Sequence, residues 1–172
     1  MKRIALCFVL LPLIFSCDIN NWADTVIENK SEFNVTFRFS NTSQIDIAIG
    51  GQATFPTEAY QRLESYTPEK RVYFTYSSTN DDYTGEFRTR ESWSVKVNNA
   101  IGQAATLSAD DWMDSIDNIP SGDQSGNAAY QKKVYTDKPN FTVTTSSGFP
   151  AVAVYNRDSA AKDFLVTIQW SK

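Results

Sequence analysis

Aromatic side chains in the middle of the sequence are the first residues whose types and spacing could bind a ligand. In the stretch 71–77, Tyr73 lies between Val72 and Phe74, so both faces of a strand there would carry an aromatic ring. Exposed rings can stack on a sugar or on another apolar face. The candidate ligand-contacting residues are Tyr73, Trp93, Trp112 and Tyr83, with Tyr60 and Tyr66 as further members of an aromatic platform. The alternative is that the segment 99–133 covers Tyr73 and makes it part of the core.

Carboxylates offer two other kinds of chemistry. The segment 99–133 contains a run of acids that could suggest calcium, but it lacks the ligand spacing of an EF-hand loop. Asp110 and Asp111 fit better as acids in the first turn of a helix, where they complement its dipole. Two carboxyl groups can also hydrolyse a glycoside, and Glu86, Glu91 and Asp111 are available, but no spacing singles out a pair. We therefore expect no metal ion, no cofactor and no catalytic residue.

The absence of histidine excludes several classes of enzyme. The chain has no histidine, and its two cysteines, Cys7 and Cys17, both lie near the amino terminus. Ser-His-Asp and Cys-His catalysis and the usual zinc or copper ligand sets are thereby excluded. A disulfide within the remaining chain is excluded as well, so the hydrophobic core must hold the fold. The sequence predicts a protein that is not an enzyme.

Alternation of apolar and polar residues with a period of two dominates the sequence, which indicates strands with one buried face. The clearest examples are 33–39, 45–49, 93–97 and 163–171. Gly50 and Gly51 between two such runs predict a hairpin turn. About nine short strands with almost no helix predict an all-β fold, an antiparallel β-sandwich, with a barrel as the alternative.

The alternation stops at Asn99 and resumes at about Val134, which predicts a long insertion near 99–133. Within it Ser108 has the character of an N-cap, and we expect one short helix of two turns from about Ala109. No internal repeat is evident in the sequence. The length of the chain after residue 16 suits one domain, so we expect a single β-sandwich domain over 24–172.

The first seventeen residues have the pattern of an export signal. Lys2 and Arg3 precede the apolar run 4–15, which is too short to span a bilayer. The residues Leu13-Ile14-Phe15-Ser16-Cys17 resemble the lipobox of bacterial prolipoproteins, although Phe15 is bulkier than is usual at its place. The resemblance implies a signal peptide over 1–16, diacylglycerol on the Cys17 sulfur and acylation, such as palmitate, of the new amino terminus. The alternative is an ordinary secretion signal that leaves Cys17 as a free thiol.

The charge of the processed chain limits its partners. Cleavage before Cys17 removes Lys2 and Arg3 from 16 basic residues and leaves all 20 acidic ones, so the side chains sum to −6. An acidic balance argues against nucleic acid and against electrostatic binding to anionic lipid. With a short tether over 17–23, we expect a lipid-anchored protein on a membrane of the bacterial cell envelope. It would act as a binding module, an adhesin, receptor-like module or accessory subunit, for a carbohydrate or an envelope protein. A structural or assembly lipoprotein without a soluble ligand is the alternative, and a carbohydrate-acting enzyme comes third.

Overall fold

Strands make up most of the part of the chain that the computed structural model describes, which is residues 24–40, 42–55, 63–79 and 82–172. Of residues 78–79 and 82–83 only the backbone is described. Within these ranges there are fifteen strands and one short 3-10 helix. The all-β class predicted from the alternation is confirmed, with more strands than the nine expected.

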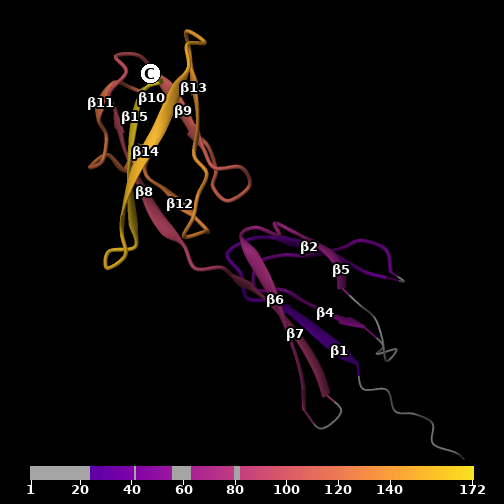
Figure 1. Cartoon of the computed structure of the whole chain (residues 1–172). Coiled ribbons are helices and arrows are strands. Elements are labelled where there is room, and N and C mark those ends of the chain that lie inside the picture. Colours follow the sequence, from indigo (N-terminus) through magenta and orange to yellow (C-terminus); the bar gives the residue numbers. More distant parts are fainter. Residues whose placement is uncertain (1–23, 41, 56–62, 80–81) are drawn as a thin grey trace, which may run out of the picture.

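The first seven strands form one lobe, residues 24–89, which we call the N-lobe (Figure 1). One of its sheets has the order β4-β1-β7-β6, and the other has the order β3-β2-β5. β1 pairs with β7 in parallel, whereas the other neighbours are antiparallel. The strands are β1 (Thr25–Asn29), β2 (Val35–Phe39), β3 (Ile45–Ile47), β4 (Gln52–Phe55), β5 (Leu63–Thr67), β6 (Val72–Thr79) and β7 (Asp82–Thr89).

The remaining strands form a second lobe, residues 93–172, which we call the C-lobe. One sheet has the order β11-β8-β15-β14, with β12 also paired to β8, and the other has the order β10-β9-β13. β8 and β15 are parallel. The elements are β8 (Trp93–Asn99), β9 (Ala105–Ser108), β10 (Ile116–Ile119), β11 (Gly122–Asp123), η1 (Ala128–Tyr130), β12 (Lys132–Val134), β13 (Thr142–Thr145), β14 (Ala151–Asp158) and β15 (Asp163–Trp170).

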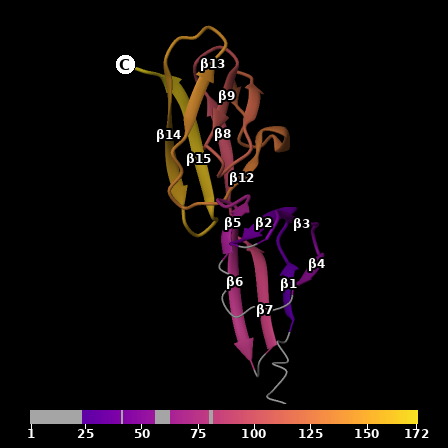
Figure 2. The same ribbon diagram turned by 90° about the vertical axis from the view of Figure 1, so that its right-hand side faces the viewer.

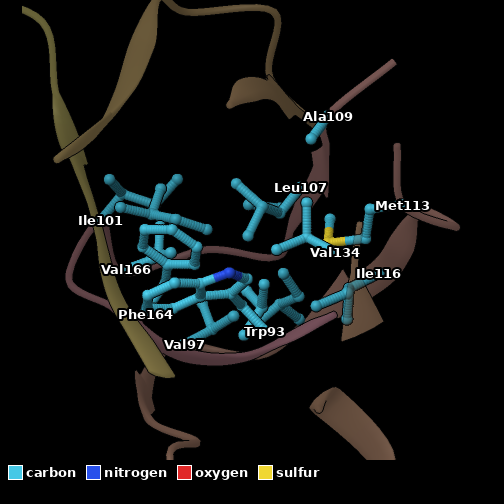
Figure 3. Packing of buried hydrophobic residues seen from close by; sticks show 14 residues of the cluster. Trp93, Val97, Ile101, Leu107, Ala109, Met113, Ile116, Val134, Phe164 and Val166 are labelled. Carbon is cyan, nitrogen blue, oxygen red and sulfur yellow. The ribbon is translucent and has the colours of Figure 1, made fainter. Parts of the chain in front are cut away.

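Each lobe has its own hydrophobic core, and the two lobes lie end to end in both views (Figures 1 and 2). In the N-lobe the inward side chains of both sheets meet around Phe37 and Phe87. In the C-lobe they meet around Leu107, Phe164 and Val166 (Figure 3). The single core expected over 24–172 is therefore corrected to two. Alternation shows that a strand has a buried face, but it does not show which strands share a core.

The two lobes repeat the same strand order. In each, the first strand lies parallel to the last strand of the lobe, and the last two strands form a long antiparallel hairpin at one side of the sheet. The second, third and fifth strands of the N-lobe form its other sheet, as β9, β10 and β13 do in the C-lobe. The structure thus contains an internal repeat that the sequence analysis did not find.

Asn29, at the end of β1, occupies a buried corner of the N-lobe. Its side-chain amide donates to the carbonyl oxygens of Phe33 (2.7 Å) and Ile47 (3.0 Å). Its carbonyl oxygen accepts from the backbone N–H of Ser31 (3.0 Å). The side chain therefore ties the turn after β1 to the end of β3.

Asn99, at the end of β8, has equivalent contacts in the C-lobe. It donates to the carbonyl oxygens of Gln103 (2.8 Å) and Ile119 (2.8 Å) and accepts from the N–H of Ile101 (3.2 Å). Like Asn29, it is fully buried. The two asparagines lie 70 positions apart, as do the first residues of β2 and β9, Val35 and Ala105. A shared buried amide at the same corner supports the equivalence of the lobes.

The expected insertion at 99–133 is a regular part of the C-lobe, because it supplies β9, β10, β11 and most of β12. The helix expected from about Ala109 is absent. Ser108 is the last residue of β9, and Asp110 has a positive φ of 45° in a tight turn. Leu107 and Ala109 are both buried, so the strand period of two continues to the turn. The acids of this segment therefore do not cap a helix, and the 3-10 helix η1 begins only at Ala128.

Arg71 is the central residue of the junction between the lobes. From the start of β6 its guanidinium donates to the carbonyl oxygen of Asp111 (2.8 Å) and pairs with the Asp114 carboxylate (2.7 Å). It also lies 5.7 Å from the ring of Phe33, which in turn packs edge-on against Tyr135. One N-lobe side chain thus reaches both a turn of the C-lobe and an aromatic pair that bridges the lobes.

Two further cations extend the junction. The Lys70 ammonium lies 5.9 Å from the ring of Trp112 and 3.6 Å from the Asp111 carboxylate. Lys133 of the C-lobe pairs with Glu32 of the N-lobe at 3.1 Å. The lobes therefore have a specific contact surface and are joined by more than the short link 90–92.

Candidate functional site

Tyr73 lies on the outer face of the β6-β7 hairpin. Val72 and Phe74 point to the N-lobe core, so the alternate residues Tyr73, Thr75 and Ser77 face away from it. Across the ladder they stand opposite Arg88, Glu86 and Thr84 respectively. Together with Tyr76, these six side chains line an open hollow of about 400 Å³. Tyr73 is half-buried on this face, and the segment 99–133, which was expected to cover it if it were part of the core, belongs to the other lobe.

The charged side chains in and beside the hollow form ion pairs with one another. The Glu86 carboxylate accepts hydrogen bonds from Lys30 and from the Arg88 guanidinium, whose Nε lies 2.6 Å away. Lys30 also pairs with Glu28 at 2.6 Å. The hydrogen bonds that Glu86 accepts from Lys30 and then from Arg88 lower the pKa of Glu86, and those that Lys30 donates to Glu28 and then to Glu86 raise the pKa of Lys30. Glu86 is therefore a fixed anion at neutral pH and not a proton donor.

This surface can recognise a polar ligand that both donates and accepts hydrogen bonds. Hydroxyl groups come from Thr75, Ser77 and Thr84, donors from Arg88 and an acceptor from Glu86. Tyr73 adds a half-buried ring, with the Arg90 guanidinium 6.0 Å from its centre. An aromatic ring beside hydroxyl and charged groups on a shallow surface suits a hydroxyl-rich molecule.

Trp93 is a core residue and not a ligand contact. It is 5% exposed, packs against Phe164 with ring centres 5.3 Å apart, and lies inside the C-lobe cluster (Figure 3). The Arg157 guanidinium covers its outer side at 4.3 Å. Trp93 begins β8, and its alternation partners Val95 and Val97 are fully buried, so its ring follows them inward.

The other predicted aromatics are also separated. Trp112 is half-buried at the junction of the lobes beneath Lys70. Tyr66 packs on Phe87 in the N-lobe core, with ring centres 5.5 Å apart. Tyr83 is described only by its backbone, which pairs in β7, while Tyr60 and Cys17 lie outside the described residues. The expected platform of Tyr73 with Trp93 or Trp112 is therefore not assembled, because these residues belong to different lobes.

The candidate carboxylates are paired with cations at separate places. Glu86 lies in the Tyr73 hollow, Glu91 in the link pairs with Lys162, and Asp111 of the C-lobe pairs with Lys70. Within the described ranges, no cluster of three or more acidic, cysteine or histidine residues could hold a metal ion. The geometry thus brings no pair of these acids into one cleft.

Sequence reasoning missed the exposed apolar surface of the β14-β15 hairpin. Among the described residues, six of the eight exposed large apolar side chains lie on this hairpin or the loop before it: Phe149, Val152, Val154, Tyr155, Leu165 and Trp170. The signal was present in the sequence, because 151–155 reads Ala-Val-Ala-Val-Tyr without the polar alternation of a strand that has one wet face.

No family model matches the chain, and no curated protein sequence matches it. Among the described residues, no helix has the length and apolar character needed to cross a membrane. The function must therefore be argued from the residues and their arrangement.

Proposed function

We propose that the protein is a non-enzymatic binding module of the bacterial cell envelope, anchored to a membrane by lipid on Cys17. Its ligand would be a hydroxyl-rich molecule, a carbohydrate of the envelope or of a surface near it, bound in the hollow around Tyr73. The observation that carries the proposal is this hollow, which offers the ring of Tyr73 with hydroxyls, an acceptor and a donor.

The course of the chain supports an anchored arrangement. β1 enters the N-lobe at the end remote from the C-lobe, and the C-terminus lies at the far end of the C-lobe (Figures 1 and 2). A lipid at Cys17, seven residues before Asp24, would hold the N-lobe near the bilayer and direct the C-lobe away from it. The Tyr73 face would then lie on the side of the membrane-proximal lobe.

The state of the charged residues favours binding over catalysis. Glu86 has a lowered pKa and two cationic partners, so it is suited to accepting hydrogen bonds from a ligand. A general acid in glycoside hydrolysis needs the opposite shift, a raised pKa. The same pairing pre-arranges the acceptor and limits the side-chain entropy lost on binding.

A structural or assembly lipoprotein is the second candidate, and the junction is the observation that favours it. A contact built from Arg71, Lys70 and Phe33 fixes the direction of the C-lobe, as a spacer would require. In that case the Tyr73 hollow would bind no soluble ligand.

Substitution of Tyr73 by alanine tests the binding proposal. The chain without residues 1–16 and with Cys17→Ser keeps every residue of both cores, and it can be screened for binding to neutral and acidic oligosaccharides and to isolated peptidoglycan. For a saccharide that binds, Tyr73→Ala should weaken binding at least about tenfold, a loss of about 1.4 kcal/mol, with little change in Tm. The matched control Phe149→Ala removes an exposed ring of the C-lobe and should leave binding unchanged. No binding to any probe, or equal loss in both variants, would contradict the proposal.

A further inference from the structure

The strand β14 is an open edge of the C-lobe sheet. The order β11-β8-β15-β14 places it last, with a partner, β15, on one side only. It is eight residues long, contains no proline or lysine, and has charges only at its last two residues, Arg157 and Asp158. Folded proteins usually block such an edge with charges, proline or a bulge, because its free backbone groups can pair with another strand.

The side chains along this edge are also apolar where water would be expected. On the outer face Val152 and Val154 are 39% and 50% exposed, and Leu165 of β15 beside them is 43% exposed. In both hairpins the first residue of one strand pairs with the last residue of the other, Val72 with Thr89 in the N-lobe and Ala151 with Trp170 in the C-lobe. Counted from these pairs, Tyr73 and Thr75 of the N-lobe are equivalent to Val152 and Val154 of the C-lobe. The two lobes share a fold, but only the C-lobe has aliphatic side chains at these two outer positions.

The stretch 141–156 contains no charged residue, in a chain whose processed form has a net side-chain charge of −6. Two copies have net charges of the same sign and so repel each other, but they can meet along this stretch without bringing like charges together. Contact between two copies is therefore most favourable along this neutral, apolar strand edge.

We infer that β14 is the contact surface for a second copy of this chain, with the two β14 strands paired antiparallel about a two-fold axis through Ala153. This register sets Val152 of each copy opposite Val154 of the other and joins four valines on the outer face. On the inner face it sets the small Ala151 opposite the large Tyr155.

Charge excludes some of the alternative registers. With the axis at Ala153, Arg157 stands opposite Phe149, and Asp158 stands opposite Gly148. An axis at Arg157 or Asp158 would oppose like charges. The axis at Ala153 places Pro150, which has no N–H, opposite Asn156, whereas an axis at Val152 would place it opposite Val154, nearer the centre of the ladder. Antiparallel pairing directs the two N-lobes away from each other. If each copy is anchored at Cys17, which rests on the proposed function, the contact would join copies from opposing surfaces.

Sedimentation of the chain without residues 1–16 and with Cys17→Ser tests the inference. Between about 1 μM and about 1 mM the protein should change from monomer to dimer. Val154→Lys places a charge at the centre of the contact and should weaken the dimer at least about tenfold. The matched control Thr75→Lys introduces a lysine at the equivalent position of the N-lobe and should leave the dimer intact. A protein that stays monomeric at the highest concentration, or a dimer that survives Val154→Lys, would overturn the inference.

A single cysteine tests the register in the same protein, which then has no other cysteine. Ala153→Cys should form a disulfide between copies under mild oxidation, because residues directly opposite in antiparallel strands have Cα atoms about 4.5–5.5 Å apart. Ala151→Cys should not, because its two copies would lie about 13 Å apart along the strands. Cross-linking of Ala151→Cys in preference to Ala153→Cys would overturn the proposed register.

Discussion

Buried asparagines show how single residues specify these lobes. Asn29 and Asn99 have no exposed surface, and each amide bonds backbone groups from two different segments. A buried polar group is stable only when its hydrogen bonds are made, so these positions tolerate little change. Neither residue was singled out from the sequence, because an asparagine after a strand usually signals an exposed turn.

Replacing either asparagine by alanine should destabilise the protein by about 2 kcal/mol, since carbonyl and N–H groups at the buried corner lose their partners. Chemical denaturation with urea measures the change. Asn98→Ala is the matched control, because Asn98 is the half-exposed neighbour of Asn99 on the other face of β8, and its free energy of unfolding should change by less than about 0.5 kcal/mol. Equal effects of Asn98→Ala and Asn99→Ala would refute the role assigned to the buried amide.

The titration of Glu86 predicts where stability depends on pH. Lys30 and Arg88 lower the pKa of Glu86 below its ordinary value of 4.5, so ionised Glu86 stabilises the fold above that value, and this contribution is lost as the pH falls through the folded pKa. Thermal unfolding should show a decrease in Tm below about pH 4.5 that is smaller in Glu86→Gln. Between about pH 6 and 8 Tm should be constant, because the chain has no histidine. A Tm transition near pH 6.5 would contradict this.

At the scale of elements, Arg71 decides how firmly the lobes are joined. Its side chain is 16% exposed, and it both pairs with the more exposed Asp114 and donates to the Asp111 carbonyl oxygen. Arg71→Ala should leave both cores intact but loosen the junction, so small-angle scattering should report a broader distribution of shapes. Arg38→Ala removes the N-lobe surface pair with Glu64 at a similar distance, 2.6 Å, and should leave the scattering unchanged. A scattering curve of Arg71→Ala identical to that of the wild type would mean that other contacts hold the lobes.

The elements also show what the sequence could and could not predict. Strands such as β8 and β15 were predicted because their alternation is regular and their buried valines and isoleucines follow one face. The prediction of a helix from Ala109 is wrong because the alternation of buried residues continues through Leu107 and Ala109, and an N-cap signal with acids does not override it. The predicted exposure of Trp93 is wrong because the alternation of residues within one strand does not show which of its faces packs against a second sheet.

On the scale of the whole molecule, the chain is two sandwiches of one topology joined by a specific contact (Figure 1). The repeat escaped the sequence analysis because equivalent strands share little more than apolar spacing, as in Thr25-Val-Ile-Glu-Asn29 and Val95-Lys-Val-Asn-Asn99. Buried faces require only apolar side chains of suitable volume, so two lobes can keep a fold while their residues diverge. The outer faces do not pack in a core and can therefore differ between the lobes. The N-lobe has a polar hollow at Tyr73, and the C-lobe has an apolar edge at Val154.

The proposed anchor at Cys17 is the central claim about this molecule, since it decides where either surface can meet a partner. Mass spectrometry of the protein from the membrane fraction of a bacterium that expresses the full chain tests it most directly. The amino-terminal peptide should begin at Cys17 and carry the mass of diacylglycerol and a further acyl chain. A peptide that begins elsewhere, or an unmodified Cys17, would show that the protein is not anchored through Cys17.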